Sequence, residues 1–348
     1  MKKKESFLLK IKREISDFFY SISVFLHTKI FKKRELATNN APISAEQIKK
    51  QKSIRKIKEL LFIWSALLIP LINLAIFWVY GTISSFPIAF EHHFSDGTMR
   101  YDWFNFQYLF NALKEPGSIF LESLKNTIVY WLFNVGVLTP VSFLMGFFLY
   151  KKIWGYKVFR YVFYLPSIVS AVIIAAFFKY MVGPGGQVPI IVEKIFGKDG
   201  ILLLADSDYA FGTLLFYNFF VGLCGDLLYW LAAFSRIPVD VVEAGKIDGL
   251  SVMGEFIYLT FPITWPFLAT MLMLKFTGIL SSGGAALLLT NGQYGTYDLN
   301  FYEYVLTISG SKASQGLSGA IGLLKGFLVL PVTLVVNHFV GKIEQVEF

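Results

Sequence analysis

Six apolar stretches constrain this chain more than any other feature, because each is long enough to cross a membrane as a helix. A transmembrane helix needs about 20 predominantly apolar residues. The six stretches are residues 60–80, 127–150, 161–181, 211–234, 262–280 and 318–340. The chain of 348 residues is 55% hydrophobic and 16% charged, and a soluble domain of this length would need more charge on its surface. The sequence therefore predicts an all-α membrane protein with six spans.

The basic residues predict how these spans are oriented. Half of the 32 lysines and arginines precede residue 60. Since segments rich in Lys and Arg stay in the cytoplasm, the N-terminus is expected there, and an even number of spans returns the C-terminus to the same side. The excess of lysine and arginine in cytoplasmic segments accounts for the net charge of +8, so this charge gives no reason to expect nucleic-acid binding. We expect a multi-pass protein of the cytoplasmic membrane with both termini inside.

Residues 1–58 are predicted to form a part of their own, ahead of a six-span domain at residues 59–348. Apolar side chains recur at helical spacing between Phe7 and Ile30, and lysines and arginines flank them. This pattern predicts an amphipathic helix that lies on the inner leaflet, with membrane lipid as its partner. The alternative is a basic tail that only fixes the orientation. Residues 37–47 have the composition of a linker.

The polar segment at residues 235–262 separates the fourth and fifth spans, and we expect it on the cytoplasmic side. Ser235 is a candidate cap and Pro238 suits a first helical turn, so residues 239–247 are predicted to be helical. Asp248-Gly249 is a turn signal, because glycine accepts a positive φ at little steric cost. A second short helix is expected to start at Ser251 and to end before Pro262.

The first of these helices has a composition suited to docking. Asp240 and Glu243 are three residues apart and share one face. Its apolar residues supply a surface for a groove in a partner. They are Val241, Val242, Ala244 and Ile247.

At this loop the sequence resembles a known family, the permease subunits of type I ABC importers. Their EAA loop contains a coupling helix that seats in a cleft of a cytoplasmic ATPase. The matching residues are Glu243, Ala244, Gly245, Asp248, Gly249 and Pro262. Gly245 departs from the family pattern, which has alanine there, and glycine weakens a helix by about 1 kcal/mol relative to alanine. The resemblance extends from about residue 103 to the C-terminus and includes the stretches at 123–130 and 222–238.

The resemblance implies partners and a class of cargo. The partners would be a second homologous permease, a cytoplasmic ABC ATPase dimer and an extracytoplasmic solute-binding protein. The chain would then work by alternating access, as half of a translocation path. The stretch at residues 287–306 is similar to the carbohydrate-uptake branch, and residues 273–283 are similar to the subgroup for oligosaccharides and polysaccharide fragments.

The chain is not expected to be an enzyme or to bind a cofactor. The phosphate loop G-x-x-x-x-G-K-[ST] is missing from the sequence, so ATP and Mg²⁺ would be used by the partner ATPase. We identify no catalytic residue and no metal site. His92-His93 is interpreted as a solvated turn, because no partner residue stands at a metal-ligand spacing. Cys224 is interpreted as a small packing residue.

Ionisable residues inside spans are the candidates for the path. Lys275 lies in the fifth stretch and Asp226 in the fourth, and a charge at bilayer depth costs about 2.5–3.5 kcal/mol, so it normally faces protein or water. The two side chains either pair across the bundle or line the path. Lys325 is expected to snorkel outward, and Gly322 and Gly326 to form a packing face. Further candidates for the path are Asn134, Asn218 and Tyr229, with Thr139, Ser142 and Tyr217.

Two alternatives to the carbohydrate permease stay open at this point. The same loop fits a permease for peptides, amino acids or phosphate. A membrane-embedded enzyme or a sensory anchor would need an active-site cluster or a soluble domain, and the sequence indicates neither. Glu243 also has a purely structural interpretation, because an acidic side chain near a helix N-terminus stabilises the helix dipole by about 0.3–1 kcal/mol.

Overall fold

The computed structural model describes residues 45–94, 96–197 and 202–340. The chain divides into two compact units, Met1–Val79 and Tyr80–Phe348. The amphipathic helix expected before residue 45 lies outside the described residues. Both chain termini, which the sequence predicts on the cytoplasmic side, also lie outside them. The described part of the first unit is helix α2, Ala45–Asn73, which continues into the π-helical turn η1, Leu74–Tyr80.

The first unit contributes one apolar helix. Its apolar side chains are exposed, as Phe62 at 74% and Ile69 at 75% show. Arg55 and Glu59 form an ion pair one turn apart, 2.9 Å between Nε and Oε1. The helix that runs from Arg55 to Phe90 is long and apolar enough to span a membrane, and the predicted span at residues 60–80 lies within it.

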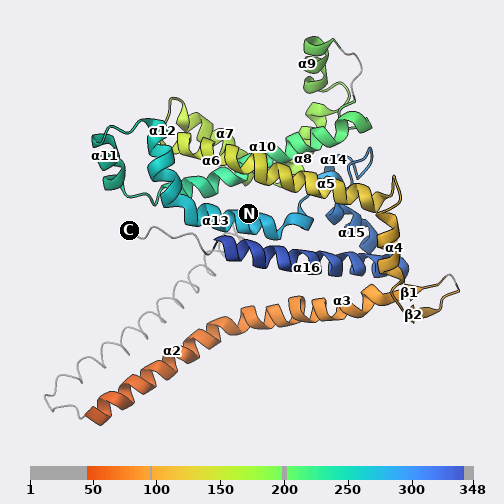
Figure 1. Cartoon of the computed structure of the whole chain (residues 1–348), viewed down its shortest axis with the longest axis horizontal. Helices are drawn as coiled ribbons and strands as arrows, with labels where there is room; N and C mark the ends of the chain where they lie inside the picture. The colour runs from red at the N-terminus through yellow and green to blue at the C-terminus, as the bar shows by residue number, and fades with distance from the viewer. Residues whose placement is uncertain (1–44, 95, 198–201, 341–348) are drawn as a thin grey trace, which may run out of the picture. The chain divides into compact units, whose positions relative to one another are not determined.

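The second unit is a bundle of helices with one short hairpin (Figure 1). Its helices up to the polar loop are α3 Gly81–Phe90, α4 Phe104–Ala112, α5 Ile119–Phe133, η2 Asn134–Leu138, α6 Thr139–Tyr150, α7 Tyr156–Ile168, α8 Ala171–Val182, α9 Gln187–Phe196 and α10 Ser207–Phe234. From the loop onward they are α11 Val239–Ile247, α12 Val252–Glu255, η3 Phe256–Thr260, α13 Phe261–Thr277, η4 Ile279–Ser281, α14 Ala286–Leu289, α15 Leu299–Ile308 and α16 Lys312–Val340.

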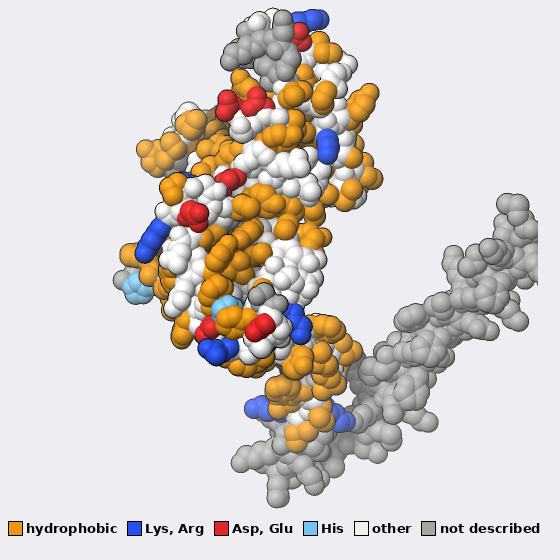
Figure 2. Space-filling model, turned by 90° about the vertical axis from the view of Figure 1, so that its right-hand side faces the viewer, with side chains coloured by type: hydrophobic (Ala, Val, Ile, Leu, Met, Phe, Trp, Pro, Cys, Tyr) orange, Lys and Arg blue, Asp and Glu red, His pale blue; other side chains and the backbone are white. Residues whose placement is uncertain are grey.

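The sequence predicted an all-α protein, and an antiparallel hairpin corrects this prediction. Strand β1, Glu91–His93, pairs with β2, Met99–Tyr101, and His92 lies opposite Arg100. The hairpin connects α3 to α4. Figure 2 looks onto the end of the molecule that carries it and shows acidic, basic and histidine side chains among apolar ones.

Within the described residues, five helices are long and apolar enough to span a membrane, and a bent pair makes a sixth only if it counts as one span. That pair is α7 and α8, which meet at 110°. It replaces the straight third span predicted at residues 161–181. The chain is extended at Val169, with φ −82° and ψ 145°, after Pro166 in the last turns of α7. Apolarity marks a segment for the membrane but does not encode such a bend.

Helices α12, η3 and α13 form one continuous helix, Val252–Thr277. The second loop helix therefore does not end before Pro262, as the sequence predicted. Pro262 occupies the first turn of α13, next to the wide π-helical turn η3. Because proline lacks an N–H group and clashes with the preceding turn, a locally widened turn lets the helix continue through it.

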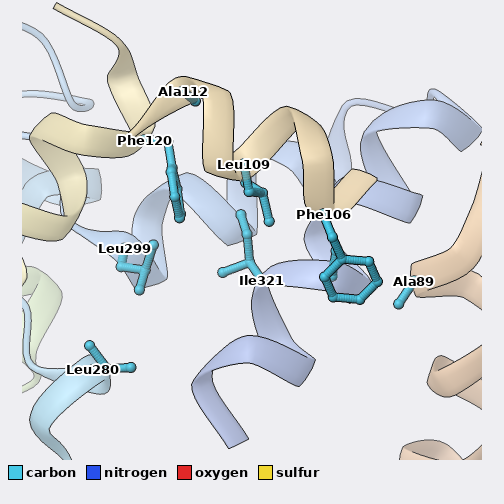
Figure 3. Packing of buried hydrophobic residues seen from close by; sticks show 9 residues of the cluster. Ala89, Phe106, Leu109, Ala112, Phe120, Leu280, Leu299 and Ile321 are labelled. Atoms are coloured by element: carbon cyan, nitrogen blue, oxygen red, sulfur yellow. The ribbon is translucent and has the colours of Figure 1, made fainter. Parts of the chain in front are cut away.

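A core cluster joins α3, α4, α5, α15 and α16 (Figure 3). In Figure 3, Leu109 of α4 points toward Ile321 of α16, and the ring of Phe106 lies beside Ala89 of α3. Two glycines let α16 approach α3 closely. A Cβ atom added at Gly316 would lie 2.7 Å from the carbonyl oxygen of Glu91, and one at Gly319 would lie 3.1 Å from the nitrogen of Ala89.

The predicted packing pair Gly322 and Gly326 plays a smaller part within this chain. An added Cβ at Gly322 would meet only the Glu303 carboxylate, at 3.2 Å, and at Gly326 it would meet no described atom within 4 Å. The close helix contact is formed by glycines earlier in α16. A small-x-x-x-small pattern marks several stretches of this helix, and only the neighbouring helix decides which of them is used.

Candidate functional site

Helix α11 lies at one end of the bundle, and α4, α14 and α15 lie toward the other (Figure 1). Its bounds, Val239–Ile247, agree with the predicted helix. The cap differs from the prediction, because Pro238 is the N-cap residue and Ser235 instead ends α10. The Ser235 hydroxyl donates to the carbonyl of Ala232, at 2.8 Å.

The two faces of α11 differ in chemistry. Val242 is buried and packs with Phe143, Phe147, Trp230, Phe234 and Leu268. Asp240, Glu243 and Ala244 are exposed on the other side. The prediction that Val242 belongs to the docking surface is therefore wrong, since it anchors the helix to the bundle. The exposed apolar residues nearby are Val239, Ile247, Val252 and Met253, each more than half accessible.

Gly249 ends α11 in a Schellman motif. Its N–H donates to the carbonyl of Lys246 at 3.1 Å, and the N–H of Leu250 donates to that of Gly245 at 3.0 Å. The φ of Gly249 is +80°, a conformation that favours glycine. Asp248-Gly249 is thus the turn that the sequence predicted. It satisfies two carbonyls at the helix end and redirects the chain into α12.

Gly245 is buried against the next helical segment. A Cβ atom at this position would lie 2.6 Å from Cδ1 of Leu259 and 3.1 Å from Cδ1 of Leu250. Glycine therefore permits close packing of α11 on η3. An alanine at this position would require the Leu259 side chain to shift, so the departure from the family pattern affects packing as well as the helix propensity considered from the sequence.

A buried ion pair fastens the loop to the second span. Nζ of Lys151, the residue that ends α6, lies 2.5 Å from Oε2 of Glu255 in α12. The side chains are 18% and 6% exposed. Neither residue was assigned a partner from the sequence. The signal available was an isolated acidic residue in an otherwise apolar helix start.

A second polar cluster lies within the spans. Nζ of Lys275 lies 2.8 Å from Oδ2 of Asp226, and both side chains are more than four-fifths buried. This confirms the pairing that was one of the two sequence interpretations. The hydroxyl of Ser142 contacts the same carboxylate oxygen at 3.5 Å and accepts a hydrogen bond from Nε1 of Trp230 at 2.8 Å. The indole of Trp131 donates to the carbonyl of Lys275, at 3.0 Å.

The other candidate path residues are only partly brought together. Nδ2 of Asn218 donates to Oδ1 of Asn134 at 2.8 Å, so α10 and η2 share a polar contact. Thr139 donates to the carbonyl of Asn134 at 2.8 Å. Tyr229 is 54% exposed, and no described hydrogen bond connects it to these residues.

Lys325 was predicted to snorkel outward, and this prediction is wrong. Its Nζ lies 2.8 Å from Oε2 of Glu303 and 2.8 Å from Oδ1 of Asn300, both in α15. Folding back of the segment between the fifth and sixth spans places these acceptors beside α16. A sequence gives no direct sign of this, because Lys325 lies in α16 and both acceptors lie in α15.

The two hairpin histidines lie in a strand and not in a solvated turn. Nδ1 of His92 lies 2.9 Å from Oδ2 of Asp102, and its ring stacks on Phe104 with centroids 3.8 Å apart. The hydrogen bond with His92 holds the pKa of Asp102 below its ordinary value. Within the described residues, no group of three or more metal-ligating side chains is found.

Comparisons with known proteins place this geometry in context. The chain is 23% identical over 278 residues to the arabinooligosaccharides transport system permease protein AraP of Bacillus subtilis, covering 78% of this chain and 86% of that protein. It is 23% identical to the polygalacturonan/rhamnogalacturonan transport system permease protein YteP of the same organism, covering 72% and 78%. No family model matches the chain.

A solved structure shares the fold. It is a chain of a bacterial ABC transporter involved in the import of the acidic polysaccharide alginate, with a TM-score of 0.70, 21% identity, and coverage of 84% of this chain and all of that one. These findings confirm the resemblance carried by the loop at residues 235–262. In sequence over most of its length, and in fold, the chain is similar to the permease subunits of sugar ABC transport systems.

Proposed function

We propose that this chain is a transmembrane permease subunit of an ATP-driven, binding-protein-dependent importer, and that its cargo is an oligosaccharide or a polysaccharide fragment. The observation that most supports this proposal is α11, a helix outside the predicted spans with an exposed acidic face and a buried apolar face. The sequence similarity to permeases of arabino-oligosaccharide and polygalacturonan systems supports the class of cargo. The protein would be a multi-pass component of the cytoplasmic membrane with both termini inside.

In this proposal α11 is the coupling helix that enters a cleft of a cytoplasmic ABC ATPase. Asp240 and Glu243 supply charge, and Ala244 and Ile247 supply apolar surface. On the other face, Val242 and Gly245 hold α11 to the bundle. Closure of two ATPase subunits on ATP and Mg²⁺ would move α11, and its packing would pass the motion to the spans.

The path would be completed by partners. A second homologous permease would supply the other half, and an extracytoplasmic solute-binding protein would deliver the sugar. A transporter of the same fold has been solved with an alginate pentasaccharide-bound periplasmic protein. In this chain the polar cluster of Asp226, Lys275, Asn134 and Asn218 would lie along the path, and the basic N-terminal segment would contact membrane lipid.

Co-purification tests the coupling role. The tagged chain is extracted in mild detergent from cells that express all subunits, and bound proteins are identified by mass spectrometry. We expect a second permease and an ATPase with the wild type. Glu243→Lys should weaken recovery of the ATPase and retain the second permease, because it reverses a charge only on the docking face.

A matched control makes the result specific. Glu193→Lys makes the same charge change on the exposed face of another short helix, α9, and should leave ATPase recovery unchanged. Uptake of labelled oligosaccharides and of a labelled oligopeptide then separates the cargo classes. Recovery of the chain alone from every sample, or uptake of peptide but not sugar, would contradict the corresponding half of the proposal.

A further inference from the structure

A pocket of about 710 Å³ lies between α8, the loop at residues 183–186 and the segment that follows α14. It belongs to the part of the second unit that lies away from α11 (Figure 1). Its volume is in the range of small-molecule sites. The polar and aromatic lining residues are Lys179, Tyr180, Thr290, Gln293 and Tyr294. None of the residues described above for coupling or for the buried polar cluster lines it.

The charge of this pocket is one-sided. Lys179 is the one charged residue among the described lining residues, and no carboxylate accompanies it. Three other lysines at or inside the spans, Lys151, Lys275 and Lys325, each have a carboxylate oxygen within 2.8 Å. Lys179 is exposed, and no described side chain pairs with it. Lys179 lies in the last turn of α8, where the helix dipole favours a positive charge, so its ammonium group stands at the pocket without a carboxylate among the described lining residues.

The loop that carries Tyr294 forms one side of the pocket and is held in place by hydrogen bonds. Tyr294 has a φ of +58°, in the left-handed region that costs a residue other than glycine about 1–2 kcal/mol. Nδ2 of Asn126 holds this loop by donating to the carbonyls of Gly295 at 2.9 Å and Tyr297 at 2.8 Å. The buried hydroxyls of Thr290 and Thr296 lie 2.6 Å apart. The strained conformation is therefore maintained by contacts around it, as is typical of ligand sites.

Two tyrosines line the pocket, Tyr180 from α8 and Tyr294 from the loop after α14. Tyr180 is 82% exposed and Tyr294 is 42% exposed. A tyrosine combines an apolar ring face with a hydroxyl group, and the exposed amide of Gln293 adds a hydrogen-bond donor and an acceptor. The pocket thus offers aromatic faces, neutral polar groups and a single free positive charge.

From this set of groups we infer that the pocket is a subsite for a carboxylate-bearing sugar residue of the imported oligosaccharide. Lys179 contacts the carboxylate, and the tyrosine rings cover the sugar. The inference rests on the proposed function and deepens it, because it identifies acidic oligosaccharides as the preferred cargo. A neutral sugar would leave the ammonium group without a partner.

The test uses the complex of this chain with its partner subunits in proteoliposomes. The probes are trisaccharides of galacturonate and mannuronate, each compared with its carboxyl-reduced, neutral counterpart of identical linkage. We expect the wild type to prefer the acidic member of a pair. Lys179→Gln should raise the KM for the acidic trisaccharide about tenfold or more and leave the neutral one unchanged, since only a charge-assisted hydrogen bond is removed.

Two further variants fix the interpretation. Lys194→Gln removes an exposed positive charge from nearby α9, outside the pocket lining, and should change neither KM. Lys179→Arg should keep the preference for the acidic sugar. Equal transport of acidic and neutral sugars by the wild type, or equal effects of Lys179→Gln on both, would overturn the inference alone. Absence of uptake of every sugar by an intact complex would overturn the proposed function instead.

Discussion

Lys151 and Glu255 connect the end of the second span to the start of the helix that carries the fifth, with 2.5 Å between Nζ and Oε2. The residues are 104 positions apart in the sequence. Because the pair is mostly buried, water screens it little, and removal of one partner leaves an uncompensated charge. The polar loop is therefore held to the bundle at two places, by this pair and by the apolar face of α11.

We predict that Glu255→Ala destabilises the protein by about 3–5 kcal/mol, since Lys151 is then left buried and unpaired. The exchange Lys151→Glu with Glu255→Lys should recover much of the stability and of the sugar uptake. Thermal unfolding of the purified complex and uptake assays check both statements. Lys157→Glu, at an exposed position in the first turn of α7, is the control. If the exchange were no better than Glu255→Ala, the pairing would not matter for stability.

Asp226 and Lys275 give a prediction that separates their two interpretations. If the pair is structural, Lys275→Met alone destabilises strongly, and the double variant Asp226→Asn, Lys275→Met is more stable than the single one, because no lone charge remains. If the residues contact cargo, the double variant folds but its KM for sugar rises severalfold. Thermal unfolding together with transport kinetics decides between these outcomes.

Gly249→Ala should impair the loop by placing a Cβ atom at a φ of +80°, at a cost of about 1–2 kcal/mol. We expect weaker recovery of the ATPase with an unchanged amount of protein in the membrane. Gly254→Ala is the matched control, because this glycine is helical and its added Cβ would meet only ordinary contacts, at 3.4 Å or more. Equal recovery from both variants would mean that the Schellman turn does not orient α11 for docking.

Asp298 predicts a dependence of stability on pH. Burial raises the pKa of this carboxyl above its ordinary value of 3.8, against the hydrogen bonds it accepts from Phe301 and Gly284. A raised pKa means that the folded state favours the protonated form, so this contribution is present below the ordinary value and is lost as pH rises through the raised one. Asp298→Asn should therefore flatten the stability profile above about pH 4.

Thermal unfolding of the complex between pH 4 and 7 measures this slope. Asp96→Asn is the comparison, because hydrogen bonds from Thr98 lower the pKa of the exposed Asp96 carboxyl. Removal of Asp96 should not flatten the profile in the same direction. A wild-type profile that is already flat over this range would show that Asp298 titrates alike in the folded and unfolded protein.

Local signals in the sequence predicted local structure well. The bounds of α11 follow from Pro238 and from the Asp248-Gly249 turn, because proline and glycine restrict the backbone wherever they occur. Most of the predicted apolar stretches lie in helices that are long and apolar enough to span a membrane, because length and composition are the signals of a span. The Asp226–Lys275 pair was one of two interpretations, because a charge inside a span needs a partner.

Relationships between distant segments were harder to predict. In the sequence, nothing distinguishes Glu255 and Glu303 from other acidic residues, because their ion-pair partners Lys151 and Lys325 lie in other helical segments. The bend at Val169 and the pocket at Lys179 depend on how helices pack, which a hydropathy pattern does not contain. Val242 shows the limit even within α11, since the pattern showed apolar residues and the neighbouring spans decided which face was buried.

The continuous helix from Val252 to Thr277 can move as one rigid rod. Its 26 residues correspond to a rod of about 39 Å at about 1.5 Å per residue. A tilt of about 10° at one end of such a rod displaces the other end by about 7 Å, which is more than one helical turn. If a partner ATPase moves α12 as proposed above, the length of this helix would enlarge a short movement at α12 at the level where Lys275 meets Asp226.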